Sequence, residues 1–250
     1  MDDGEIEVLK NEPWTRVAKV SEEGRLLVRK TYTYPAHRCW RTILQRPRAE
    51  REARALGAAE AAGIPCLRPV QFGGRRRLGG VVSSWITTVF EDHTRPLRDY
   101  LRQPPPTSVP GGWSRLRRRL GIAMAGLVRD LHQAGVVWLT LTPRNFLVKG
   151  QPEAATLLVS DMPKAICFPK SMVGKGAARL DLFDMCFAPA RRLQFSRADR
   201  LGMLIRYCDG DRTAARRLWR RLCRRTKIGN TLRRRLLTGL TRVGLVPTAN

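Results

Sequence analysis

The segment from Leu131 to Val148 constrains the fold more than any other part of this chain. A basic amphipathic helix is predicted over 114–134 and ends at Gly135. Apolar residues follow, then a Thr-Pro-Arg-Asn turn, and then an apolar stretch that predicts a short strand over 146–149. The segment therefore predicts a long helix that is joined to a strand through a turn carrying Asn145.

The end of this segment resembles the catalytic loop of protein kinases, which has the pattern H-R-D-L-x-x-x-N. In that loop the Asp accepts the proton of the acceptor hydroxyl, and the Asn holds a metal ion. When the pattern is anchored on Asn145, its His, Arg and Asp fall on Trp138, Leu139 and Thr140. A threonine cannot act as a general base at neutral pH. The similarity therefore implies a kinase-like fold with a degenerate catalytic loop.

An acidic residue follows the next predicted strand. Asp161 comes directly after the apolar stretch 157–160, sixteen residues beyond Asn145. Protein kinases place the Asp of their D-F-G motif, which is the principal Mg²⁺ ligand, at such a position. By this similarity Asn145 and Asp161 supply a pair of oxygen ligands suited to a hard cation. An aspartate that only forms a turn is the alternative interpretation.

Residues 1–90 predict a small unit in which strands surround one helix. Alternating residues over 15–20 and 25–30, with a turn at 21–24, predict a β-hairpin. Strong helix formers over 48–62 predict a helix that stops at Gly63. Further strands are expected near 70–72 and over 81–90, on either side of a basic, glycine-rich turn.

Two charged residues of this unit are candidates for a nucleotide site. Lys30 ends an apolar strand, where the V-A-I-K lysine of kinases belongs, and Arg29 points to the opposite face. Glu52 on the following helix is the expected ion-pair partner, with Glu50 as the alternative. Taken singly, each of these residues could be an ordinary surface charge. Residues 17–28 hold only Gly24, so a glycine-rich phosphate loop is not indicated.

The rest of the chain predicts a larger helical unit. A polar break over 91–96 is expected to connect the units, followed by a short helix over 97–101, a loop over 103–112 and basic helices from about 177 onward. The expected fold is α+β and bilobal, like a protein kinase. A small β-rich N-lobe spans 1–90, a larger helical C-lobe spans 91–250, and together they form one kinase-like domain.

Composition bears on partners and location. The formal net charge of +26 favours an anionic partner, although a bias toward arginine that only aids solubility is an equal alternative. The six cysteines form no C-x-x-C pair and predict buried, reduced thiols in a cytoplasmic protein. The acidic N-terminus indicates no signal peptide, and no apolar run is long enough to span a bilayer.

Several short motifs together resemble the lipopolysaccharide core kinases, the family of Kdo and heptose kinases, from about residue 14 to 226. These motifs are Arg51-Glu52-Ala53-Arg54-Ala55-Leu56, Ala62-Gly63-Ile64-Pro65, Leu131-His132-Gln133-Ala134-Gly135-Val136, Pro143-Arg144-Asn145-Phe146-Leu147-Val148, Phe195-Ser196-Arg197-Ala198-Asp199-Arg200-Leu201 and Ile205-Arg206-Tyr207.

This resemblance implies ATP and Mg²⁺ as cofactors. Lys30 would contact the ATP phosphates, Glu52 would hold Lys30, and Asn145 with Asp161 would bind Mg²⁺. No role carries over to Thr140, which occupies the position of the catalytic Asp. A missing base typically costs roughly 10²–10⁴-fold in rate, so residual transfer remains conceivable. Replacement of the His and Arg by Trp138 and Leu139 also removes the groups that usually brace the loop.

Three functional hypotheses follow. The first is ATP-dependent phosphoryl transfer to a sugar hydroxyl of an anionic glycolipid core. The second is a pseudokinase scaffold, either nucleotide-binding or nucleotide-free, whose basic surface docks on an inner-leaflet membrane surface or a partner enzyme. The protein is then expected to be cytoplasmic or peripheral at the inner membrane. Arginines over 216–225 flank an apolar helix face, which fits lipid headgroups or a simple solvated face. The third, specific nucleic-acid binding, ranks last because no recognition motif is present.

Overall fold

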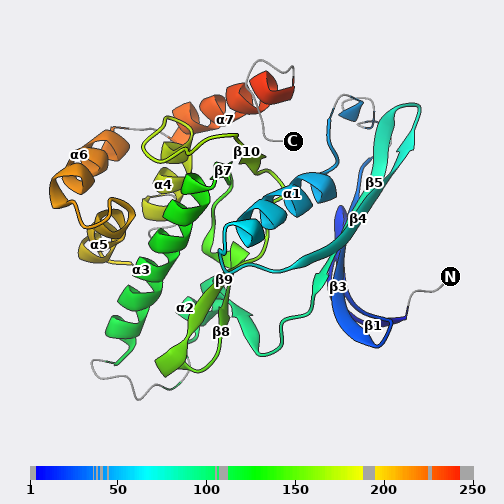
Figure 1. Cartoon of the computed structure of the whole chain (residues 1–250), viewed down its shortest axis with the longest axis horizontal. Helices are drawn as coiled ribbons and strands as arrows, with labels where there is room; N and C mark the ends of the chain where they lie inside the picture. The colour runs from blue at the N-terminus through cyan, green and yellow to red at the C-terminus, as the bar shows by residue number, and fades with distance from the viewer. Residues whose placement is uncertain are drawn as a thin grey trace.

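A five-stranded antiparallel sheet forms the first part of the chain in the computed structural model (Figure 1). The structure describes residues 4–242 except 36, 38, 40, 41, 44, 105, 107–111, 188–194, 225 and 226. The strand order is β1-β2-β3-β5-β4. The strands are β1 (Glu5–Glu12), β2 (Thr15–Glu22), β3 (Arg25–Thr33), β4 (Pro69–Arg77) and β5 (Gly80–Val89). The strand β3 is therefore central in the sheet.

One helix packs against this sheet. The helix α1 (Arg48–Ala61) follows β3 in sequence and contacts β3, β4 and β5. Its buried stripe consists largely of alanine, with Ala49, Ala55 and Ala59 fully covered beside Leu56. Small side chains allow a close approach of the helix to the strands, which positions the one buried acid of this stripe, Glu52, toward the sheet.

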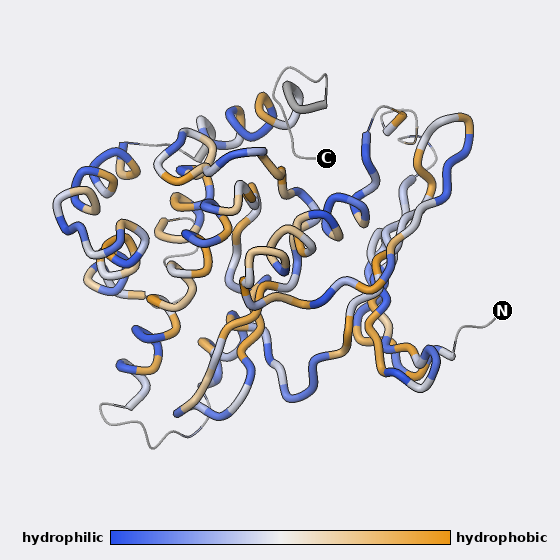
Figure 2. Tube along the Cα trace, viewed as in Figure 1, coloured by the Kyte–Doolittle hydropathy of each residue, from blue (hydrophilic) through white to orange (hydrophobic). Residues whose placement is uncertain are grey.

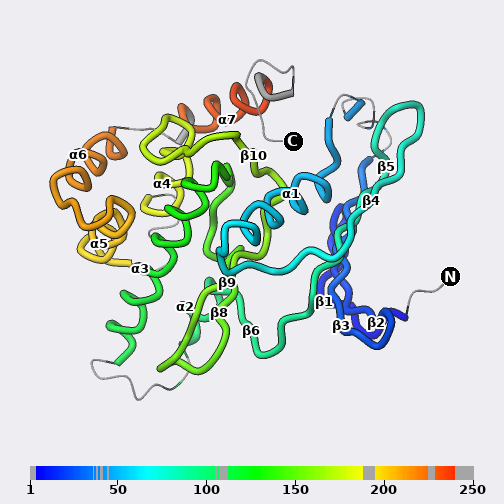
Figure 3. The backbone as a smooth tube through the Cα atoms, in the orientation of Figure 1, coloured from blue at the N-terminus to red at the C-terminus, as the bar shows by residue number. Residues whose placement is uncertain are grey.

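The second part of the chain is mainly helical. Its centre is α3 (Gly112–Gln133), which contacts α5 and a three-stranded sheet of order β6-β8-β9 (Figure 3). The short strands β7 (Val136–Val137) and β10 (Ile166–Cys167) pair beside it. The remaining elements are β6 (Thr94–Pro96), α2 (Leu97–Arg102), β8 (Phe146–Lys149), β9 (Thr156–Val159), α4 (Ala178–Cys186), α5 (Arg197–Tyr207), α6 (Arg212–Cys223) and α7 (Lys227–Arg242).

A continuous core joins the two parts. Leu56 and Ile86 of the first part belong to the same buried cluster as Met124, Trp138 and Phe146 of the second. Figure 2 shows apolar and hydrophilic residues alternating along α3, as expected for a helix with one buried stripe. No helix among the described residues is both long and apolar enough to cross a membrane. The expected α+β, bilobal arrangement is confirmed, while the boundary at residue 90 stays a prediction.

Several local expectations are corrected. The strand β1 has no counterpart in the sequence prediction, and the predicted glycine-rich turn over 73–80 is a strand hairpin that turns only at Leu78 and Gly79. Most of the loop expected over 103–112 lies outside the described residues. All six cysteines are free thiols, but only Cys186 is buried, because the others lie at element edges.

Candidate active site

Lys30 lies between two carboxylates from different parts of the fold. Its ammonium nitrogen is 3.1 Å from Oε1 of Glu52 on α1 and 2.6 Å from Oδ1 of Asp161, which follows β9. Tyr32, on the same face of β3, donates a hydrogen bond of 2.5 Å to Glu52. Glu50, the alternative partner, instead accepts from Arg54 at 3.2 Å. The central strand thus places a fixed cation where the two parts meet.

Burial and charge act against each other in this cluster. Burial disfavours the charge of Lys30, but the attraction of Glu52 and Asp161 outweighs it and raises the pKa of the lysine. Burial also raises the pKa of Glu52, which is only 2% exposed, and the nearby ammonium opposes this rise. Lys30 therefore remains a cation that is held by two acids.

Asn145 and Asp161, the predicted metal ligands, are joined by hydrogen bonds. The 3₁₀ turn Pro143–Asn145 directs the Asn145 amide nitrogen to the carbonyl oxygen of Asp161 at 3.1 Å. The amide oxygen of Asn145 accepts from the Thr142 hydroxyl at 3.0 Å. The backbone amide of Ser160 donates to the Asn145 carbonyl at 3.0 Å. The catalytic-loop segment and the end of β9 are therefore held together.

These two residues fit Mg²⁺ as a minimal ligand pair. Oδ1 of Asp161 contacts Lys30, whereas its Oδ2 accepts no hydrogen bond within the described residues and the side chain is 34% exposed. The Asn145 oxygen has one lone pair left beyond its bond to Thr142. Over the described part of the chain, no group of three or more His, Cys, Asp or Glu side chains could hold a metal ion. A Mg²⁺ here would keep several waters or phosphate oxygens as ligands.

The segment before Thr140 is braced by residues that the sequence did not reveal. Asp181, at the start of α4, accepts hydrogen bonds from the backbone amides of Trp138 at 2.6 Å and Leu139 at 2.7 Å. His132 at the end of α3 lies 3.1 Å from the same carboxylate, and its other ring nitrogen lies 2.8 Å from the Tyr207 hydroxyl. The loop is therefore braced by other groups than the His and Arg of the kinase pattern, whose positions Trp138 and Leu139 occupy.

Trp138 itself also takes part in this bracing. Its indole nitrogen donates to the carbonyl oxygen of Asp161 at 2.7 Å, and its ring contacts Phe146 with centroids 5.0 Å apart. The sequence signal that was available is the pair of acids Asp181 and Asp184 in the otherwise largely apolar segment Ala178–Cys186, since a buried charge needs partners.

The single glycine of residues 17–28 lies in the β2–β3 hairpin turn, at one end of the five-stranded sheet. Gly24 forms the turn before Leu26, whose carbonyl accepts from Phe90 where the sheet ends. The opposite end of the sheet carries the β1–β2 turn, where the Trp14 carbonyl accepts from Thr33 at 3.3 Å. This turn contains Pro13 and Trp14 and no glycine. Neither turn carries the glycine-rich pattern of a phosphate-binding loop, as the sequence indicated.

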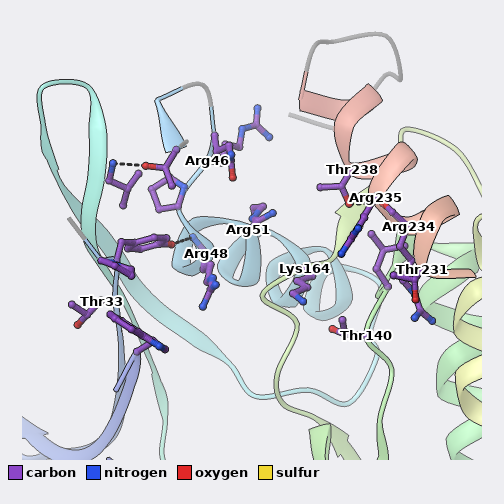
Figure 4. A pocket seen from close by; sticks show the side chains of 18 residues that line it. Thr33, Arg46, Arg48, Arg51, Thr140, Lys164, Thr231, Arg234, Arg235 and Thr238 are labelled. Carbon is purple, nitrogen blue, oxygen red and sulfur yellow. Dashed lines mark hydrogen bonds between the residues drawn. The ribbon is translucent and has the colours of Figure 1, made fainter. Parts of the chain in front are cut away.

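A cavity of about 700 Å³ opens beside Thr140 (Figure 4). Thr140 and Leu139 form part of its wall, and α1 and α7 supply facing sides. Its basic lining residues are Arg46, Arg48, Arg51, Lys164, Arg234 and Arg235. Among the described residues that line it, none is acidic. Sequence analysis missed this cluster, because its members come from three separate stretches of the chain.

Fold and site together define a protein-kinase-like protein, with a lysine–glutamate pair beside an aspartate and a loop asparagine. Structures of similar fold include WaaP in complex with acyl carrier protein, with a TM-score of 0.63, 22% identity, and coverage of 93% of this chain and 87% of that one. The PknI kinase domain of Mycobacterium tuberculosis, in a mutant form, matches with a TM-score of 0.49, 16% identity, and coverage of 76% and 72%.

Residues 8–207 match the lipopolysaccharide kinase (Kdo/WaaP) family. The chain belongs to this family. No curated protein matches it significantly in sequence. The resemblance drawn from the motifs is thereby confirmed at the level of the family and the fold.

Proposed function

We propose that this protein transfers the terminal phosphoryl group of ATP to a sugar hydroxyl of an anionic glycolipid core. The observation that carries the proposal is the position of Lys30 between Glu52 and Asp161, at 3.1 and 2.6 Å. A fixed cation beside a carboxylate with one free oxygen suits a nucleotide triphosphate and its Mg²⁺. Membership of the Kdo/WaaP family supports a lipopolysaccharide-type acceptor.

Each residue has a defined task in this proposal. Lys30 binds phosphate oxygens of ATP, Glu52 orients Lys30, and Asp161 and Asn145 hold Mg²⁺, which neutralises charge on the phosphates when bound. The bond between the terminal phosphorus and its bridging oxygen breaks, that oxygen leaves with ADP, and the sugar oxygen forms the new bond. The hydroxyl proton passes to solvent, because position 140 carries no carboxylate. Phosphoryl transfer depends mainly on positioning and charge neutralisation, which these residues supply.

Thr140 makes the expected reaction slow. It occupies the position of the catalytic base and faces the basic cavity. Loss of a positioned base costs roughly 10²–10⁴-fold in rate. The arginines and the lysine around the cavity favour an anionic acceptor next to Thr140 and so offset part of this loss.

The test has a binding step and a transfer step. Thermal unfolding is measured with and without ATP and Mg²⁺ for the wild type, Lys30→Met and Asp161→Asn. ATP at about 100 times Kd adds roughly 2.7 kcal/mol, or about 5–10 °C in Tm for a chain of this size. Transfer of labelled phosphate from ATP to purified lipopolysaccharide core follows, with Asp161→Asn as the inactive control. An unshifted wild-type Tm would overturn the proposal.

A second candidate is a pseudokinase that binds nucleotide and acts as a scaffold. The observation that favours it is Thr140 itself, together with a cavity whose described lining residues include no carboxylate. The same experiment separates the two: a Mg²⁺-dependent Tm shift without any labelled product would assign the protein to this class. Restoring the base by Thr140→Asp is then expected to create activity only if the acceptor site is intact.

We also infer a cytoplasmic protein that is peripheral at an anionic membrane leaflet. On α7, Leu232 and Leu236 are 59% and 63% exposed and lie one turn apart, next to Arg233 and Arg235. Exposed leucines flanked by arginines suit a helix lying on anionic lipid. On α6, by contrast, Leu222 is buried and Trp219 packs against the core, so its arginines form a solvated face.

Membrane binding is measured by sedimentation with anionic and neutral vesicles. Leu232→Ser with Leu236→Ser is expected to abolish the bound fraction, whereas arginine-to-glutamine changes at Arg216 and Arg220 on α6 keep it. An acidic protein partner is the other inference from the net charge of +26, in line with the acyl carrier protein bound to WaaP. Retention of this protein on immobilised acyl carrier protein, abolished by moderate salt, would support that partner.

A further inference from the structure

The cavity beside Thr140 concentrates positive charge that the protein only partly neutralises. Arg46 lies 3.6 Å from Glu50, and Arg234 forms an ion pair with Asp184. Arg48 contacts the rings of Tyr32 and Tyr34 at 5.8 and 5.6 Å. Within the described residues, Lys164 has neither a hydrogen bond nor an ion pair. The cluster therefore carries more cations than carboxylates.

The electrostatic cost of this arrangement is visible at Lys164. Partial burial lowers the pKa of its ammonium, and the nearby guanidinium groups of Arg48, Arg51 and Arg234 lower it further. Arg235 on α7 likewise has no hydrogen-bond or ion-pair partner in the part of the chain that is described, and its side chain is exposed. Like charges that outnumber the carboxylates around them destabilise the folded chain unless a further anion joins them.

The cations approach the cavity from different directions. Arg48 and Arg51 project from the first turns of α1, Lys164 comes from the segment after Asp161, and Arg235 comes from α7 (Figure 4). The N-terminus of α1 also lies at the cavity, with Pro47 before its first residue Arg48, so the positive end of the helix dipole faces this region, although the Arg48 amide already donates to the Tyr34 hydroxyl at 2.9 Å. A planar carboxylate offers oxygens in one plane, whereas a tetrahedral phosphate offers them in several directions.

We propose that this cavity binds a phosphate-bearing ligand that bridges α1, Lys164 and α7. The volume of about 700 Å³ exceeds that of a phosphate group, so the ligand has a further body, such as a sugar or lipid headgroup. Such a ligand would fix α1, the helix that carries Glu52, relative to α7. It would also lie against Thr140.

This cavity adjoins the site proposed for nucleotide, because Arg48 contacts the Tyr32 ring and Tyr32 donates to Glu52, but the two sites use different cations. Lys30, Glu52, Asn145 and Asp161 are not among the described residues that line the cavity, and Lys30 contacts Asp161 at 2.6 Å. The inference rests on the proposed function in one respect, because that proposal places its anionic acceptor in this cavity, but phosphate binding here and nucleotide binding at Lys30 are tested by different variants. A Lys30→Met variant removes the cation of the nucleotide site but leaves every cation of the cavity.

The experiment uses inorganic pyrophosphate as the probe, titrated without Mg²⁺ by calorimetry into the full chain. The cavity variant combines Lys164→Met with Arg235→Gln, two exposed residues whose replacement leaves the core intact. The matched control combines Arg216→Gln with Arg220→Gln, which removes the same charge from the solvated face of α6. We expect about a tenfold or greater loss of pyrophosphate affinity in the cavity variant. The control and Lys30→Met are expected to stay within about twofold of the wild type.

If the cavity variant and the α6 control lost pyrophosphate affinity equally, the proposal would be overturned, because the loss would reflect net charge alone. A loss of pyrophosphate affinity in Lys30→Met alone would overturn it too, since pyrophosphate would then occupy the nucleotide site. Binding to two kinds of phosphatidylcholine vesicle then shows whether the phosphate belongs to a lipid. One kind contains phosphatidic acid, and the other contains enough phosphatidylserine to give the same net charge. The ligand is a lipid-borne phosphate if the protein prefers phosphatidic acid, if pyrophosphate abolishes this preference, and if the cavity variant lacks it. Pyrophosphate binding without that preference assigns a soluble phosphorylated ligand.

Discussion

The carboxylate of Asp181 accepts a hydrogen bond of 2.7 Å from the backbone amide of Leu139, a buried leucine with a φ of +64°. A left-handed conformation costs a non-glycine residue about 1–2 kcal/mol and persists only where its surroundings impose it. The second oxygen of Asp181 holds the amide of Trp138 at 2.6 Å. The helix α4 therefore fixes the backbone directly before Thr140, and with it the wall of the basic cavity.

Backbone strain at Leu139 predicts that a glycine variant is more stable than an alanine variant, which is the reverse of the usual order. Leu139→Ala and Leu139→Gly both lose the buried side chain, which is 2% exposed, and both are expected to lose about 2–4 kcal/mol of stability. Glycine, however, relieves the positive φ, so Leu139→Gly is expected to be more stable than Leu139→Ala by up to about 1 kcal/mol. Urea denaturation measures both.

Leu141 provides the matched control, because it is also buried but has no positive φ. There the alanine variant is expected to be more stable than the glycine variant, since glycine gains backbone freedom on unfolding. The same order of alanine and glycine at both positions would show that Leu139 is not strained.

Removing the charge of Asp181 is expected to be strongly destabilising. Asp181→Asn keeps the shape of the side chain but replaces one acceptor oxygen with a donor facing a backbone amide. His132 also loses its anionic partner, 3.1 Å away in a fully buried position. Broken buried networks of this kind cost about 3–5 kcal/mol, which thermal and chemical unfolding would detect. The exposed Asp92→Asn serves as control, and a comparable loss there would refute a special role for Asp181.

The sequence predicted the elements whose signals are local. The hairpin around Gly24, the alanine-rich helix α1 and the strand before Asp161 each depend on residues within one short stretch, and all form as expected. Glu52 was the expected partner of Lys30, with Glu50 as the alternative, and the structure confirms Glu52, which lies on the buried stripe of α1. Roles of these residues in nucleotide binding stay predictions.

Contacts between distant stretches could not be predicted in this way. Asp181 lies 49 residues from His132 and 43 residues from Trp138, and no local pattern indicates that they meet. The basic cavity likewise depends on how α7 packs near α1 and Lys164, so its arginines look in sequence like ordinary surface charges. The strand β1 was missed because the alternation of polar and apolar residues covers only its first half, Glu5 to Val8, and all eight of its residues are exposed, so no apolar face marks it as part of a core.

Asp184 predicts a pH dependence of stability. Burial raises the pKa of its carboxyl from 3.8 to about 6, although Arg234 on α7 opposes this rise. Because the folded-state pKa is the higher one, the folded state binds the proton more tightly. The stabilisation from this group is therefore complete below about pH 4 and is lost as the pH rises through about 6. Its upper limit is about 3 kcal/mol, from 1.36 kcal/mol for each pH unit.

The measurement compares the free energy of unfolding of the wild type and Asp184→Asn between pH 4 and 7. The amide does not titrate, so the wild type is expected to lose stability relative to the variant as the pH rises. Arg234→Met, which removes the opposing cation, should move this loss to higher pH. If the free energies of unfolding of the wild type and Asp184→Asn changed in parallel with pH, Asp184 would have the same proton affinity in the folded and the unfolded chain.

The pair of Lys30 and Glu52 predicts strong coupling in a double-mutant cycle. Lys30→Met leaves Glu52, only 2% exposed, without its cation, which is expected to cost about 3–5 kcal/mol near neutral pH. Adding Glu52→Gln removes the stranded charge, so the double variant is expected to be more stable than Lys30→Met alone. Chemical denaturation of the wild type, both single variants and the double variant gives the coupling energy. The partly exposed pair of Arg54 and Glu50 is the control, for which coupling of less than about 1 kcal/mol is expected. If the two cycles gave equal coupling energies, the Lys30–Glu52 pair would contribute no more than a surface ion pair. The proposal that Glu52 holds Lys30 rigidly in the nucleotide site would then be contradicted.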